Sequence, residues 1–171
     1  MANLYTLAAI GATFTPSKNM ITLFNGTGSG IILKVWKIWA LNNQTVAVTG
    51  ILGTLELRLI TSTSGGGSLT ALKHNSTITS LPSQVVAAEG ATNTLSSLFR
   101  KIYWSTDEPI ATSSTMDEMA LNKSWSEIWN IPITNTNLEP ITLNEGQGIC
   151  LSFNTVSSVG QADFFIEFTS T

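Results

Sequence analysis

Charged side chains are scarce in this sequence of 171 residues, since Lys, Arg, Asp and Glu make up 11% of it, against about 25% in an average domain. The eight Lys and Arg residues are scattered and the net charge is −3. Binding to a phosphate backbone needs clustered cations, so we expect no nucleic-acid partner. A surface with few charges is also less costly to desolvate, which favours proteins that are covered in assemblies.

Cysteine and histidine each occur once, as Cys150 and His74. A single cysteine cannot form an intrachain disulfide, and this pair cannot make a tetrahedral zinc site without carboxylates. His74 lies in the polar segment LKHNST, whereas Cys150 lies in a strand-like segment that suits a small buried hydrophobe. We therefore expect no catalytic residue, no cofactor and no metal ligand.

Long apolar runs are absent, and none approaches the ~20 residues of a membrane span. The N-terminal segment is apolar but has no basic region before it, so it is a poor signal peptide. We expect no membrane partner. Residues 1–18, which include the helix- and strand-breaking Pro16, are predicted to be an N-terminal arm that docks on a neighbouring chain through Leu4, Leu7 and Ile10. Residues 19–171 are predicted to be a single domain.

Alternating apolar and polar residues are the main structural signal. Three segments, TLELRLIT (54–61), GICLSFN (148–154) and DFFIEFT (163–169), have the period of two that is typical of half-buried strands. With several shorter strand candidates and turn-rich connections, they predict an all-β, antiparallel β-sandwich that is jelly-roll-like. The only helix start signal is a capping box at Thr115 and Glu118, so we expect at most one or two short helices. The inward residues are predicted to be Leu55, Leu57, Leu59, Ile149, Leu151, Phe153, Phe164, Ile166 and Phe168.

Three glycines, Gly26, Gly28 and Gly30, precede the apolar run IILKVWKIWAL. Their G-x-G-x-G spacing is not a dinucleotide fingerprint, and no Walker lysine follows. We interpret them as a hairpin bend with at least one positive φ, followed by one long strand. A strand that is apolar on both faces is either central or covered by a partner. The faces are predicted to be Ile31, Leu33, Val35 and Trp39 on one side and Ile32, Trp36 and Ile38 on the other.

Acidic residues gather in one section of the chain, beside tryptophans. Paired carboxylates can hydrolyse a glycosidic bond, so a hydrolase is one alternative, although a solvated loop and helix start is the interpretation that we favour. The tryptophans suit either a glycan-binding platform or anchors in a protein interface. The acids are Asp107, Glu108, Asp117, Glu118 and Glu127, and the candidate interface tryptophans are Trp36, Trp104, Trp125 and Trp129.

Several turn and strand patterns resemble those of tailed-bacteriophage virion proteins. They are the run ITLFNGTGSGIILKVWKIWALNNQTVAVTGILGTLELRLITSTSGGGS (21–68), the short LPSQV (81–85), and the closing ITLNEGQGICLSFN (141–154) and ADFFIEF (162–168). About two thirds of the chain is covered, and the likeness weakens between residues 100 and 135. The patterns are similar to those of jelly-roll capsid decoration or cement proteins.

The resemblance implies a structural role without enzymatic activity. It implies an accessory capsid decoration or cement subunit that stabilises the shell, with the major capsid protein as partner. It further implies a homo-oligomer, with a trimer favoured over a dimer, that is made in the host cytoplasm and located in the virion. The alternative is a tail or head-fibre β-sandwich module that binds host glycans.

Overall fold

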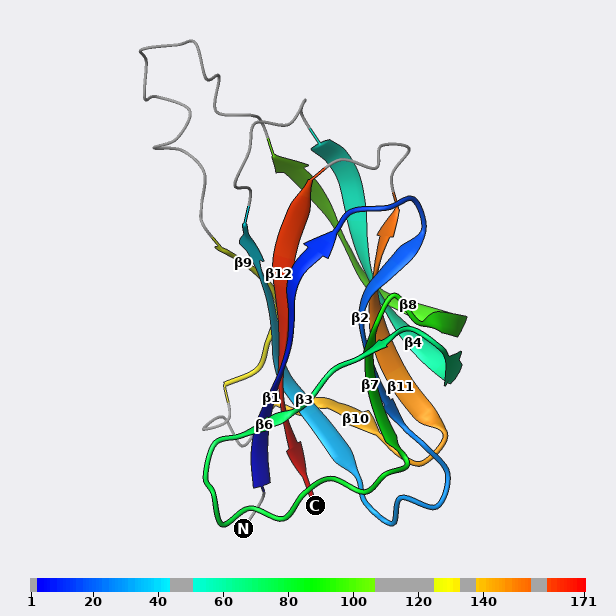
Figure 1. The fold of residues 1–171 in the computed structure, drawn as a ribbon, viewed down its shortest axis with the longest axis vertical. Helices are drawn as coiled ribbons and strands as arrows, with labels where there is room; N and C mark the ends of the chain where they lie inside the picture. Colours follow the sequence, from blue (N-terminus) through cyan, green and yellow to red (C-terminus); the bar gives the residue numbers. More distant parts are fainter. Residues whose placement is uncertain (1–2, 44–50, 107–124, 133–137, 155–159) are drawn as a thin grey trace.

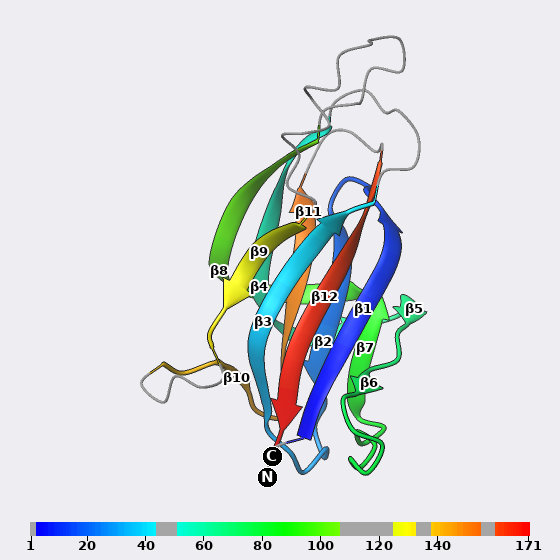
Figure 2. The same ribbon diagram turned by 90° about the vertical axis from the view of Figure 1, so that its left-hand side faces the viewer.

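A computed structural model describes residues 3–43, 51–106, 125–132, 138–154 and 160–171, and all regular structure in these ranges is β-strand (Figures 1 and 2). The helix predicted around Thr115 lies outside the described residues. The strands are β1 (Asn3–Thr13), β2 (Lys18–Asn25), β3 (Leu33–Asn42), β4 (Ile51–Ser64), β5 (Gly67–Ser68), β6 (Leu72–Lys73), β7 (Val85–Glu89), β8 (Thr92–Thr106), β9 (Trp125–Asn130), β10 (Ile141–Leu143), β11 (Gln147–Asn154) and β12 (Gln161–Ser170).

The strands form two antiparallel sheets that pack face to face, as Figure 1 shows. The first, sheet A, has the order β10-β3-β12-β1-β6, and β9 also pairs with β3. The second, sheet B, has the order β5-β7-β2-β11-β4-β8. The prediction of an all-β, antiparallel sandwich is therefore confirmed, while the finer jelly-roll class stays a prediction.

The core lies between the two sheets and is built from the alternating residues of long strands. On β11 and β12 the predicted inward residues are 0–1% exposed, which confirms the predicted alternation there. On β4, Leu55 and Leu57 are buried, while Leu59 is partly buried and packs against the core. Aromatic rings join the layers, because Phe14 follows β1 and its ring lies 4.2 Å from that of Phe153 on β11.

The N-terminal segment is an integral strand of the domain rather than an arm. β1 lies between β12 and β6 in sheet A. It pairs with β12 from Asn3 to Thr13, with one shift of register between Ala9 and Ala12. Leu7 is completely buried in the chain's own core, and Tyr5 stacks on Phe168 at 5.3 Å. The prediction that residues 1–18 dock on another chain is therefore wrong. The apolar segment that suggested docking is a core strand, with Tyr5, Leu7 and Ala9 on its inward face.

The long strand β3 is central in sheet A, as the apolar run predicted, but its two faces differ from the predicted ones. Leu33 and Val35 point inward, yet so do Ile38 and Ala40. A β-bulge explains the change, because Val35 pairs with Phe168 and Lys37 with the preceding Glu167, which leaves Trp36 as an extra residue. One extra residue moves every later side chain of the strand to the opposite face of the sheet. Trp39 therefore lies on the outer face, where it stacks on Phe165 at 4.0 Å.

The glycine-rich segment connects the two sheets instead of closing a hairpin. β2 belongs to sheet B and β3 to sheet A, so residues 26–32 cross from one layer to the other. The hairpin prediction is wrong because two strands that are neighbours in sequence can pack face to face rather than pair. The conformational part of the prediction is confirmed, since Gly28 and Gly30 have φ of 82° and 70°.

Candidate functional site

The three residues of β1 that were predicted to make an interface have different environments. Leu7 is in the core, so it cannot contact another chain in the folded protein. Leu4 is half-buried, and Ile10 is 61% exposed on the outer face of sheet A. Ile10 is therefore the member of this group best placed to meet a partner.

The four predicted interface tryptophans do not form one cluster among the described side chains. Trp36 is half-buried on β3, where its indole Nε1 donates a hydrogen bond of 2.9 Å to Thr169 Oγ1. Trp129 lies on β9 at the open side of the sandwich. The backbones of Trp104 and Trp125 belong to β8 and β9, but their side chains lie outside the described residues.

The edge strand β8 is the most exposed apolar element that the structure describes. It is fifteen residues long and, among the described strands, pairs with β4 alone. Tyr103 is 83% exposed, and Leu95, Leu98 and Phe99 are 44–46% exposed. Long, apolar edge strands are ready templates for pairing with another chain, and proteins normally shield them. We therefore regard β8 as the candidate interaction surface; sequence reasoning included only its Trp104.

A groove beside β8 extends this surface across the open side of the sandwich. It has a volume of about 300 Å³ and lies between β8 and the strands β9 and β10. Phe99 and Trp129 face each other across it, with ring centroids 6.2 Å apart. The indole Nε1 of Trp129 is buried and has no hydrogen-bond acceptor within the described part of the chain. The groove is lined by Leu59, Phe99, Trp129, Glu139, Pro140, Ile141, Thr142 and Gln147.

The two cationic side chains of β8 already interact with neighbouring strands of the domain. Arg100 Nη1 donates a hydrogen bond of 2.9 Å to the backbone oxygen of Ile128, which ties β8 to the edge of sheet A. Lys101 Nζ lies 3.3 Å from Glu56 Oε1. No Asp or Glu occurs between Thr92 and Thr106. The edge therefore presents mainly apolar and hydroxyl side chains, and its two charges are already engaged by neighbours.

His74 and Cys150 lie far from any catalytic arrangement in the described residues. His74 Nε2 is 2.7 Å from the hydroxyl of Thr6 on the outer face of sheet A. Cys150 is fully buried, and burial raises the pKa of its thiol, which a hydrogen bond with Ser152 at 3.5 Å only partly opposes. A reactive thiol needs the opposite shift. Cys150 is therefore a small buried residue, although it lies on the face of sheet B that points away from the central core.

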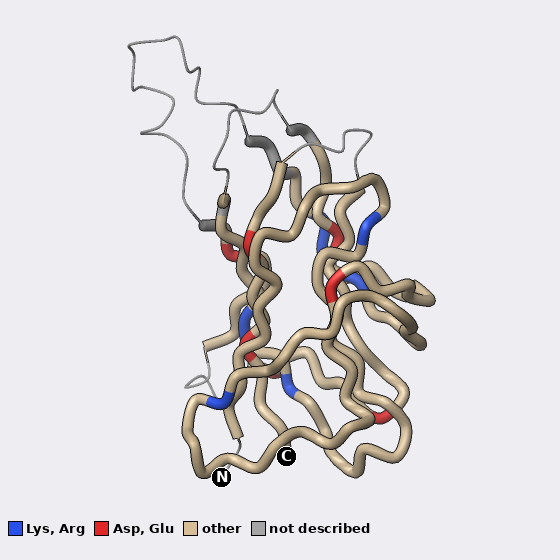
Figure 3. Tube along the Cα trace, in the orientation of Figure 1, with Lys and Arg blue, Asp and Glu red and all other residues tan. Residues whose placement is uncertain are grey.

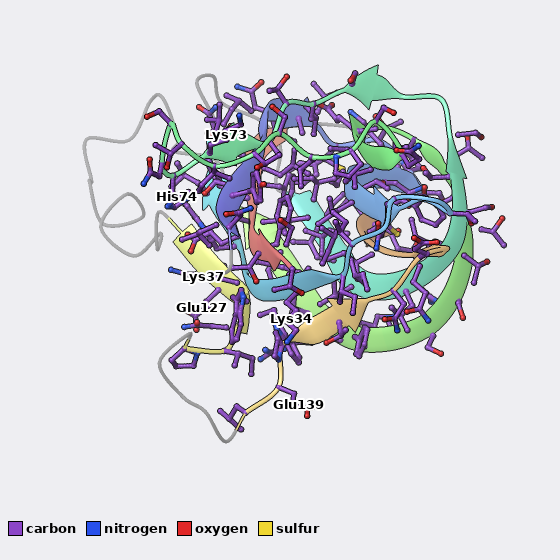
Figure 4. All side chains as sticks on the ribbon, turned by 90° about the horizontal axis from the view of Figure 1, so that it is seen from below. Lys34, Lys37, Lys73, His74, Glu127 and Glu139 are labelled. Carbon is purple, nitrogen blue, oxygen red and sulfur yellow. The ribbon has the colours of Figure 1, made fainter. Side chains whose placement is uncertain are left out.

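The charged side chains labelled in Figure 4 are spread along the outside of sheet A and do not converge on one point. Glu127, on β9, accepts a hydrogen bond of 2.8 Å from Asn130. The other four predicted acids of the hydrolase alternative lie outside the described residues. Among the residues that are described, no group of three His, Cys, Asp or Glu side chains is close enough to hold a metal ion.

The glycine-rich crossover does bind an anion, but the anion belongs to the chain itself. The backbone N–H groups of Gly28 and Gly30 donate hydrogen bonds of 3.0 and 2.7 Å to the carboxylate of Glu145, in the turn before β11. These two bonds lower the pKa of Glu145. Backbone donors arranged in this way make an anion-binding concavity, and here Glu145 fills it.

Comparisons with protein-family models, with characterised proteins and with solved structures find no match to this chain. No helix in the described part of the chain is long and apolar enough to cross a membrane.

Proposed function

We propose that this protein is a structural component of a tailed-phage virion, an accessory capsid decoration or cement subunit that bridges and stabilises major capsid subunits. The observation that carries the proposal is the exposed β8 edge, with four large apolar side chains at 44–83% exposure. Left open, such an edge would promote aggregation. A protein whose working state is an assembly covers it.

The order of the strands supports the jelly-roll class that goes with this role. Counted inward, β1 pairs with β12, β2 with β11, β3 with both β10 and β9, and β4 with β8. Nested antiparallel pairs of this kind arise when a long hairpin is rolled into two layers, which is the jelly-roll arrangement found in viral capsid domains.

The chemistry of the surface fits a mechanical function. An extended segment of a capsid subunit would add to β8 through main-chain hydrogen bonds, while its apolar side chains fill the groove beside Phe99 and Trp129. Burying one exposed large apolar side chain contributes about 1.5–3 kcal/mol. Many such bridges on one shell act together through avidity, and self-association into a trimer would add to the effect.

The proposal is tested by sedimenting the purified protein with phage shells that lack it. We expect saturable binding at a fixed ratio to the major capsid protein. Replacing Leu98 and Tyr103 together by Ser should reduce binding at least about tenfold, because two apolar contacts are lost. Leu72→Ser is the matched control, since Leu72 on β6 is also 61% exposed but lies at the other edge of the sandwich.

Three results would contradict the proposal. One is the absence of binding to shells. Another is a copy number far below that of the capsid protein, which would favour a head or tail fibre. The third is equal loss of binding in the β8 variant and in the Leu72→Ser control, which would mean that binding does not depend on the β8 edge.

A further inference from the structure

The ion pairs of the described residues gather at one place on the outer side of sheet B. The chain has 8 basic and 11 acidic residues, and five of them form the ion pairs found in the described ranges. Lys18 Nζ lies 2.7 Å from Glu89 Oε1, while Glu56 pairs with Arg58 at 2.8 Å and with Lys101 at 3.3 Å. Figure 3 shows blue and red segments close together on the upper part of this sheet.

Three of these residues, Lys18, Glu56 and Arg58, line a pocket of about 520 Å³, within the ~300–1,000 Å³ range of small-ligand sites. Four separate parts of the chain build it: the start of β2 with the residue before it, the strand β4, the first residues of β8 with the turn before them, and the end of β11. The lining residues are Ser17, Lys18, Asn19, Glu56, Arg58, Gly90, Ala91, Thr92, Asn93, Leu95, Ser152, Phe153 and Asn154.

Hydrogen bonds fix the polar side chains of this pocket. Asn19 Nδ2 donates to the backbone oxygen of Ala91 at 2.7 Å, and Ser152 Oγ donates to Asn19 Oδ1 at 2.6 Å. These bonds hold both side chains in one orientation. A ligand that meets such preorganised groups loses less conformational entropy on binding.

The guanidinium of Arg58 is held in the same way. Its Nε and Nη2 both lie 2.8 Å from Glu56 Oε2, and the Glu56 side chain is only 9% exposed. The Nη1 group of Arg58 has no protein acceptor within the described part of the chain. Arg58, with its side chain 26% exposed, therefore presents a positioned and still unused donor to the pocket.

Stability alone does not account for this network. A largely buried ion pair is often no better for the free energy of unfolding than apolar residues of the same size. Three cations against two anions leave the site with a net charge of +1. The site therefore attracts an anionic ligand, and the unused Nη1 of Arg58 can donate a charge-assisted hydrogen bond to a carboxylate oxygen.

The exposed rim of the pocket indicates what else the ligand carries. Ser17, Thr92 and Asn154 are exposed there, and hydroxyl and amide groups can both donate and accept hydrogen bonds. Such groups match the hydroxyls of a sugar ring, while Leu95, which is 46% exposed, offers an apolar surface to its carbon face. We propose that this pocket binds a monosaccharide unit that bears a carboxylate, with the carboxylate next to Arg58 Nη1.

The proposal is tested by titrating the full chain, labelled with ¹⁵N, with methyl glucuronide as the probe. The neutral methyl glucoside and inorganic phosphate serve as comparison ligands. We expect saturable shifts of the amides that line the pocket, and binding of the glucoside and of phosphate that is at least about tenfold weaker, since a hydrogen bond to a charged group is lost or mismatched.

Two variants and one control keep this test decisive. The first variant combines Glu56→Gln with Arg58→Gln. It removes both charges of the pair together, so no buried charge is left unpaired. Its affinity for the glucuronide should fall about tenfold or more. If this variant does not fold, Asn154→Ala replaces it, because Asn154 is exposed; it should weaken binding about threefold to tenfold, as expected for one neutral hydrogen bond. Lys34→Gln, on sheet A, should leave affinity unchanged.

The proposal is overturned if the glucuronide causes no saturable shifts, or if the shifts lie away from the pocket. It is also overturned if the glucoside or phosphate binds as tightly as the glucuronide, or if the folded pocket variants bind as tightly as the Lys34→Gln control. Because none of these measurements involves a shell, and because the substituted pocket residues lie on β4 and β11, the outcome is distinguishable from that of the proposed structural role.

Discussion

The carboxylate of Glu145 accepts a hydrogen bond of 2.7 Å from the backbone N–H of Gly30, a residue 115 positions earlier in the chain. A second bond of 3.0 Å comes from Gly28. Together they fasten the crossover between β2 and β3 to the turn that precedes β11. The positive φ of both glycines is what aims their N–H groups at one carboxylate.

We expect this contact to make stability depend on pH. The two backbone bonds lower the pKa of Glu145 in the folded state, so its contribution is complete above the unfolded pKa of about 4.3 and is lost as the pH falls through the lower folded pKa. Melting temperatures of the wild type and of Glu145→Gln, measured from neutral to acid pH, should converge in acid. A constant difference at every pH would contradict this.

Removing β1 should unfold the protein. Leu7 is completely buried, so Leu7→Ala should cost about 2–5 kcal/mol, and deletion of residues 2–14 exceeds what a domain stable by about 5–15 kcal/mol tolerates. Circular dichroism and urea unfolding measure both. Ile10→Ala is the control, because Ile10 is 61% exposed on the same strand. A folded deletion variant would show that β1 is dispensable.

Gly148→Ala should destabilise the centre of sheet B. A Cβ on Gly148 would lie 2.6 Å from the backbone oxygen of Leu23 and 2.7 Å from Cδ2 of Phe24, so β11 and β2 would have to separate. We expect a loss of about 3 kcal/mol or more, at the upper end for overpacked sites, because two of the three closest atoms belong to the backbone. Gly30→Ala is the comparison, because a Cβ there meets no atom within 4 Å and only left-handed strain of about 1–2 kcal/mol remains. Equal effects would contradict the steric explanation.

The thiol of Cys150 should be unreactive in the native protein. It is fully buried, and burial raises its pKa, so little thiolate forms at neutral pH. Alkylation with iodoacetamide should follow global unfolding and rise steeply with urea. Cys150→Ser should cost at most about 1–3 kcal/mol, since Ser152 Oγ lies within hydrogen-bonding reach of this position. Rapid alkylation without denaturant would show that the site opens locally.

The sequence identified the strands of the core well, because their periodicity depends only on which side of the strand each residue occupies. The alternation of Leu151 and Phe153 with Ser152 needs no knowledge of the partner strand. The same reasoning failed on β3, because the bulge at Trp36 is fixed by its pairing with β12. A pattern read along one strand cannot contain that information.

The candidate sites were less predictable, because they join residues that are distant in sequence. The alternation in TLELRLIT sets Glu56 and Arg58 opposite the inward leucines, but no local feature of the sequence indicates that Lys18, Glu89 and Lys101 lie nearby. The exposed edge was missed for a similar reason. The segment around Phe99 has the composition of any strand, and only the sheet order makes β8 an outermost strand.

The position of β12 between β3 and β1 determines when the protein can finish folding. Asn3 pairs with Ser170, and Leu33 pairs with the same residue on the other side, so β1 has no main partner until β12, which follows much later in the chain, has left the ribosome. At about 5–20 residues per second, the wait is roughly 10–30 s. During that time the apolar face of β1 is open to chaperones and to other nascent chains. A message truncated before Gln161 therefore yields a chain without the middle of sheet A.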